Sequence, residues 1–188
     1  MQRYFSALTI VLLLGMVWGR VLLMRKAGIK ATKFGEIDKK DFSIPPFAFF
    51  YFYLVFAHAF NLPTVSKQEF FHSEIVFGAG VFLCVAGLLL LLLSLVSFGK
   101  SFRVGIDANH PDKLVTTGIF AFSRNPIYVA FGLVLVGQFF LFSNWILLVY
   151  IIAALWLFQR QISREEQYLR DHYGQQYLAY CDRVRRYL

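Results

Sequence analysis

The sequence is short of charged residues and of cysteines, and each shortage excludes a class of protein. Charged residues are 16% of the 188 residues, whereas 58% are hydrophobic. This balance is too apolar for an ordinary soluble domain and indicates an integral membrane protein. Cys84 and Cys181 are the two cysteines. They form no disulfide framework, metal-ligand spacing or redox motif, so we expect no metal site.

Long apolar runs predict the membrane helices, because a spanning helix needs about 20 apolar residues. The last apolar stretch is too long for one span, and Ser143-Asn144 interrupts it, which predicts a tight helical hairpin. The predicted spans are roughly 5–23, 44–62, 75–98, 126–142 and 145–160. The predicted fold class is therefore an all-α integral membrane protein with about five transmembrane helices, the last two a hairpin, and a cytoplasmic C-terminal helical tail.

We expect one membrane domain over residues 1–188. Residues 1–98 hold three spans, and residues 99–188 hold a loop, the hairpin and the tail. The first run is kept as a helix rather than a signal peptide, because Val17-Trp18-Gly19-Arg20 is a poor cleavage site.

The distribution of lysine and arginine predicts the orientation. With five spans, all but two of the 19 basic residues fall on one side, and only Arg3 and Lys67 fall on the other. The positive-inside rule then places the N-terminus outside and the tail in the cytoplasm, and we expect a prokaryotic cytoplasmic membrane. We attribute the net charge of +8 mostly to the basic residues that set the orientation in the membrane and contact anionic lipids. A nucleic-acid partner is not expected, because no soluble basic and aromatic surface is present.

The stretch from Leu114 to Tyr128 is the main candidate site. In it, Asn125 is a good N-cap residue and Pro126 suits the first helical position, so a helix is predicted to begin here. A helix N-terminus suits an anionic ligand, and the planar guanidinium of Arg124 can bind a carboxylate or phosphate. An arginine beside a membrane helix is also a common topology signal, and both interpretations stay open. The preceding polar connection, 98–117, is expected to form a wall of the site.

Two adjacent glutamates in the tail have different predicted environments. Glu165 shares a stripe at helical spacing with Ile162 and Leu169, so we expect it to face the packed side and to be held by an opposite charge or by a polar ligand. Glu166 has Arg170 four residues later, which predicts an ordinary surface ion pair.

Four short motifs in this order resemble one family. They are residues 113–120 (KLVTTGIF), 124–128 (RNPIY), 164–166 (REE) and 173–180 (YGQQYLAY). Together they resemble the isoprenylcysteine carboxyl methyltransferase family, whose relatives include phospholipid methyltransferases. The resemblance covers roughly residues 95–188, and the first two spans match no motif.

The resemblance implies a membrane-embedded enzyme that binds S-adenosylmethionine and methylates a lipid-like, lipidated or small hydrophobic acceptor, with carboxyl methylation as one form of the reaction. It implies Arg124 as the catalytic residue and Arg160 and Gln161 as substrate-binding residues. The implied cofactor-binding residues are Lys113, Leu114, Val115, Phe120, Asn125, Pro126, Ile127, Tyr128 and Glu165.

Three positions depart from the family pattern. Asn125 replaces a histidine, Phe120 replaces a tyrosine, and Gln161 replaces an arginine that serves the substrate. Two other functions therefore stay open. One is an NADPH-dependent sterol-type membrane reductase, because such reductases have a similar tail ending in a Tyr-Cys pair, here Tyr180-Cys181. The other is a non-catalytic membrane protein that keeps the fold.

Overall fold

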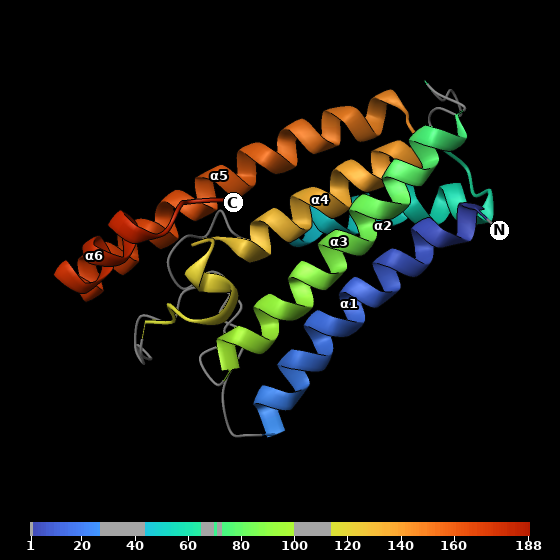
Figure 1. Ribbon diagram of the computed structural model, residues 1–188. Coiled ribbons are helices and arrows are strands. Elements are labelled where there is room, and N and C mark those ends of the chain that lie inside the picture. Colours follow the sequence, from blue (N-terminus) through green and yellow to red (C-terminus); the bar gives the residue numbers. More distant parts are fainter. Residues whose placement is uncertain (1, 27–43, 65–69, 71–72, 100–113) are drawn as a thin grey trace.

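The computed structural model describes residues 2–26, 44–64, 70, 73–99 and 114–188, and the regular elements within them are helical (Figure 1). The long helices lie side by side in a bundle, and a shorter helix follows at one end. The helices are α1 (Gln2–Lys26), α2 (Ile44–Phe60), α3 (Glu74–Phe98), α4 (Pro126–Leu141), α5 (Trp145–Tyr173) and α6 (Gln175–Arg183), with a 3-10 helix, η3 (Gly118–Ala121), before α4. The predicted all-helical class is confirmed for these residues.

Three of the helices, α1, α3 and α5, are long and apolar enough to cross a membrane. The other two predicted spans are the shorter apolar helices α2 and α4, of 17 and 16 residues. At about 1.5 Å per residue these two reach about 25 Å, less than the hydrocarbon core of about 30 Å. The structure therefore supports a multi-pass membrane protein, whereas the count of five spans stays a prediction.

The predicted hairpin is present. Helix α4 ends at Leu141 and α5 begins at Trp145. Asn144 caps α5, because its side-chain oxygen accepts a hydrogen bond from the Leu147 N–H at 2.9 Å. Helix α5 then continues without a break through the charged segment that follows its apolar part, and it ends where Gly174 adopts φ +51°.

Polar contacts mark the two ends of the helical bundle. At one end Arg3 donates to the Asn61 side chain at 2.7 Å, and the Phe70 N–H donates to the Ser143 carbonyl at 2.8 Å. The opposite end, which we call the tail end, is where α3 ends, α4 begins and α6 lies (Figure 1). Here Arg20 of α1 donates to the Gly99 carbonyl.

Glycines let α3 and α4 approach closely and so fix the position of α4. A Cβ atom added at Gly80 would lie 2.9 Å from the Gly137 carbonyl oxygen. One added at Gly87 would lie 2.8 Å from the Ala130 carbonyl oxygen. Such contacts need residues without side chains, as in many packed membrane helices. The start of α4 is thereby held firmly against α3.

Candidate functional site

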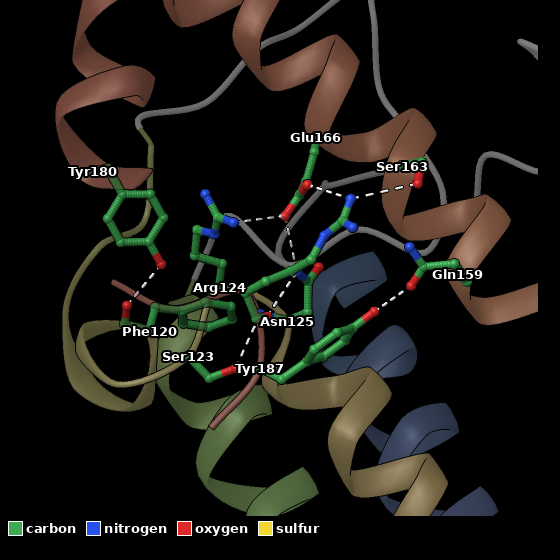
Figure 2. A network of polar contacts seen from close by, with 10 residues as sticks. Phe120, Ser123, Arg124, Asn125, Gln159, Ser163, Glu166, Tyr180 and Tyr187 are labelled. Atoms are coloured by element: carbon green, nitrogen blue, oxygen red, sulfur yellow. Dashed lines mark hydrogen bonds and ion pairs between the residues drawn. The ribbon is translucent and has the colours of Figure 1, made fainter. Parts of the chain in front are cut away.

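The start of α4 lies in a network of polar contacts at the tail end (Figure 2). Asn125 occupies the N-cap position and Pro126 begins the helix, as predicted. The predicted side-chain cap is wrong, because the Asn125 side chain makes no capping hydrogen bond. Its amide instead donates to the Glu166 carboxylate at 3.3 Å and to the Arg186 carbonyl at 3.1 Å. The bond to Glu166 is the stronger kind, because its acceptor is charged.

Glu166 is the centre of this network, so the predicted surface pair with Arg170 is wrong. The residue is 9% exposed. Its carboxylate lies 2.6 Å from the Arg186 guanidinium and 3.5 Å from that of Arg124. It lies four residues after Ile162, which is 1% exposed, so the buried face of α5 includes Glu166. The same carboxylate, through its hydrogen bond, raises the pKa of Arg186 above its ordinary value.

Glu165 has a separate set of partners. The Tyr128 hydroxyl donates to its carboxylate at 2.7 Å, and the Gln161 amide donates to the same oxygen at 3.0 Å. Glu165 is half-buried, as are Gln161 and Arg160. The structure thus brings together three predicted site residues, and it places the predicted substrate residue Gln161 on the carboxylate expected to bind the cofactor.

The segment 184–188 returns across the start of α4. The Arg124 N–H donates to the Arg185 carbonyl at 3.0 Å, and the Asn125 amide holds the next carbonyl. The Tyr187 hydroxyl donates to the Gln159 side chain of α5. Sequence reasoning missed this segment, because contacts between residues about 60 positions apart leave no periodic signal in the chain.

Helix α6 buries two tyrosines of the motif 173–180 to which the sequence assigned no role in the site, and one of them joins α6 to η3. Tyr177 and Tyr180 are 1% and 3% exposed, and the Tyr180 hydroxyl donates to the Phe120 carbonyl at 2.7 Å. Burial raises the pKa of Tyr180 to about 12 and raises that of Tyr177 further, with Glu166 adding to the effect. Their spacing of three residues, one side of a short helix, was the available signal.

The apolar residues of the predicted cofactor site lie in two places. Leu114 packs against the α6 tyrosines, and Phe120 is buried with its ring 4.5 Å from that of Phe98. Val115 is half-buried. Ile127 instead packs into the core between α1, α3 and α4, so only its backbone belongs to the site. Lys113 and most of the predicted wall, residues 100–113, lie outside the described residues.

The chemistry of the tail end suits a ligand that carries both positive and negative groups. Glu165 is a half-buried carboxylate, and the first turn of α4 has N–H groups that no side chain caps. The Nε atoms of Arg124 and Arg186 are buried and have no hydrogen-bond partner among the described residues. Carboxylates bind cations, whereas guanidinium and helix N-terminal N–H groups bind anions. No group of three or more potential metal ligands occurs in the described part of the chain.

Comparison with known proteins places these residues in a family. The phospholipid methyltransferase family model matches residues 75–176, more than half of the chain. The chain is 31% identical over 108 residues to protein-S-isoprenylcysteine O-methyltransferase B of Arabidopsis thaliana. The aligned residues are 56% of this chain and 55% of the relative. It is 35% identical over 106 residues to protein-S-isoprenylcysteine O-methyltransferase of Schizosaccharomyces pombe, covering 55% and 44%.

The enzyme of the same name from Rattus norvegicus is 27% identical over 128 residues, covering 66% of this chain and 45% of the relative. The chain therefore spans about half the length of the curated relatives it matches. The matched region includes α3, α4 and α5, and with them the α4 start and both glutamates. The resemblance predicted from the motifs is confirmed, and the chain belongs to the phospholipid methyltransferase family.

Proposed function

We propose that the protein is a membrane-embedded methyltransferase that binds S-adenosylmethionine at the tail end and methylates a lipid-like, lipidated or small hydrophobic acceptor. One observation carries the proposal. The family match includes the start of α4 and the α5 glutamates, and in the folded chain each glutamate contacts the start of α4, Glu166 through Asn125 and Glu165 through Tyr128.

The residues present fit the cofactor. S-adenosylmethionine has an ammonium, a carboxylate, ribose hydroxyls and a flat adenine. Glu165 would hold the ammonium or the ribose hydroxyls, and the N–H groups at the start of α4 would hold the carboxylate. Leu114, Val115 and Phe120 would pack the adenine. When bound, the cofactor supplies an electrophilic methyl group on a sulfonium.

The protein's own residues would supply position rather than acid–base chemistry. Tyr128 and Gln161 hold one oxygen of Glu165, which fixes the direction of its carboxylate. Methyl transfer is an in-line displacement, so alignment of the reacting atoms and exclusion of water lower most of the barrier.

Arg124 is the residue we assign to the acceptor. Its 3.5 Å contact with Glu166 is long, whereas Arg186 contacts the same carboxylate at 2.6 Å. Arg186 can therefore keep Glu166 neutralised while Arg124 turns to an anionic acceptor. A two-pronged guanidinium suits a carboxylate or a phosphate.

The names of the relatives point to two acceptor classes. The curated relatives are named for S-isoprenylcysteine, which has a carboxylate beside a lipid chain. The family is named for phospholipids. Both acceptors are lipids with a polar end, and either would reach the tail end from the membrane surface. We also propose that α2 and α4 span the membrane, which makes five spans. With five spans, all but two of the 19 basic residues fall on the side of the tail end, so we place that end in the cytoplasm and the N-terminus outside.

The test is methyl transfer from labelled S-adenosylmethionine by purified protein in detergent. One arm supplies a farnesylated cysteine derivative and the other a membrane phospholipid extract. Incorporation into either acceptor, reduced in a Glu165→Gln variant at low cofactor concentration, supports the proposal. Oxidation of NADPH without any methyl transfer would instead support a reductase, and neither activity would support a non-catalytic protein.

A further inference from the structure

A second polar cluster lies inside the bundle, away from the tail end. It contains Gln138 of α4, Ser6 of α1 and Tyr51 of α2, which are 0%, 1% and 6% exposed. One polar atom of each is buried and has no hydrogen-bond partner among the described residues: Gln138 Oε1, Ser6 Oγ and the Tyr51 hydroxyl. Each belongs to a different helix.

Contacts connect these groups to one region. The Gln138 amide donates to the Ser6 carbonyl at 3.1 Å. One turn further along α1, Thr9 contacts the Cys84 thiol of α3. That thiol lies 3.9 Å from the carbonyl oxygen of Val134, one turn before Gln138.

Tyr51 completes the region from the side of α2. Its hydroxyl is within electrostatic range of the Cys84 thiol. Its ring packs in the same core cluster as Ile10 of α1 and Leu135 of α4. Four helices therefore bring polar groups to one buried place.

Leaving these groups unpaired is costly. An unsatisfied buried donor or acceptor destabilises a protein by about 1–3 kcal/mol, and more than about 90% of buried polar groups have a partner. Buried water molecules make about three hydrogen bonds to such groups.

We propose that this cluster binds ordered water between α1, α2 and α4. A water molecule would donate a hydrogen bond to Gln138 Oε1 and accept hydrogen bonds from the Ser6 and Tyr51 hydroxyls. It would thereby satisfy all three groups and join three helices by polar contacts. Gln138 lies 13 residues after Asn125 on α4, about 20 Å along the helix, so this site does not depend on the proposed function.

X-ray hydroxyl-radical footprinting tests the site in the native protein in detergent. Radicals formed from a bound water oxidise the side chains that touch it, even where bulk solvent is excluded. Tyr150 is the matched control: it stacks on Tyr51 with ring centroids 5.0 Å apart and is 7% exposed, but its hydroxyl donates to the Phe47 carbonyl at 3.1 Å. We expect Tyr51 to be oxidised several times faster than Tyr150.

Two variants identify the source of that oxidation. Gln138→Leu removes the acceptor, and Ser6→Ala removes one hydroxyl without adding bulk, so it keeps the test valid if the first variant does not fold. A lower Tyr51 rate in either variant, with the Tyr150 rate unchanged, supports the water site. Equal rates for the two tyrosines in the native protein would overturn the proposal. A Tyr51 rate that stays at the native value in both variants would also overturn it, since oxidation would then come from bulk solvent.

Discussion

Glu166→Gln should release the segment 184–188 from the start of α4. The carboxylate of Glu166 contacts Arg186 at 2.6 Å, Arg124 at 3.5 Å and Asn125 at 3.3 Å. Glutamine keeps the shape and one acceptor oxygen but removes the charge. If Glu166 only formed a surface pair with Arg170, as the spacing in the sequence predicted, the substitution would have almost no effect.

The size of the effect follows from the burial of the two partners. Loss of one partner of a fully buried pair costs about 3–5 kcal/mol, whereas an exposed pair contributes about 0.2–1 kcal/mol. The side chain of Glu166 is 11% exposed and that of Arg186 is 32% exposed. We therefore expect an intermediate loss of about 2 kcal/mol. The open population of the segment then rises about thirtyfold, because about 1.4 kcal/mol is tenfold.

Limited trypsin digestion, followed by mass spectrometry, measures that population when opening is faster than cleavage. The informative bonds follow Arg183 and Arg185. Glu165→Gln is the matched control, because it removes the same charge at the neighbouring residue, whose carboxylate contacts Tyr128 and Gln161. We expect faster cleavage only in Glu166→Gln. Equal rates in the two variants would show that Glu166 does not hold the segment.

Three further predictions concern the same end of the molecule. Raising the pH from 10 to 12 should loosen α6 from η3, because burial raises the Tyr180 pKa from 10.0 to about 12; its stabilisation is complete below pH 10 and lost as the pH rises through 12. Trypsin sensitivity against pH measures this step, which Tyr180→Phe should lack. Gly118→Ala should lower the free energy of unfolding, measured by thermal unfolding, by about 1–3 kcal/mol. Gly118 has φ +65°, and an added Cβ atom would lie 2.4 Å from Ser97 Oγ. The control is Gly132→Ala, which should not destabilise the protein, because an added Cβ atom there would have nothing within 4 Å. Arg124→Ala should lower the rate of methyl transfer about a hundredfold at nearly unchanged cofactor affinity, and Arg124→Lys should restore little. Full turnover in Arg124→Ala would leave this arginine as a topology signal.

The helices could be predicted from the sequence because their signals are local. The apolar runs 126–142 and 145–160 reproduce the start of α4 and of α5 within a residue, since a proline and the N-cap residue Asn144 mark them. The family could be predicted for the same reason, because its motifs are short and contiguous. Helix α5 continues to Tyr173, beyond the predicted span 145–160. The span was predicted from the length of the apolar run, whereas the charged second half of the helix keeps the helical spacing after that run has ended.

The arrangement of the two glutamates could not be predicted, because it depends on contacts distant in the chain. The spacing rule assigned Arg170 to Glu166, but the returning segment brings Arg186 to the same carboxylate. The stripe at helical spacing predicted that the two neighbours differ, but it placed Glu165 rather than Glu166 on the more buried side. Glu165 and Glu166 are adjacent on α5, yet one contacts Tyr128 and the other contacts Asn125. Only the position of α4 against α5 decides which is more buried.

Calorimetric titration of the purified protein with S-adenosylhomocysteine and, separately, with NADPH tests the central claim most directly. The proposed function predicts that S-adenosylhomocysteine binds and NADPH does not. It also predicts that Glu165→Gln weakens S-adenosylhomocysteine binding by about tenfold or more, on the order of 1.4 kcal/mol. Binding of NADPH with no binding of S-adenosylhomocysteine would contradict the proposed cofactor, and an unchanged affinity in Glu165→Gln would contradict the proposed site.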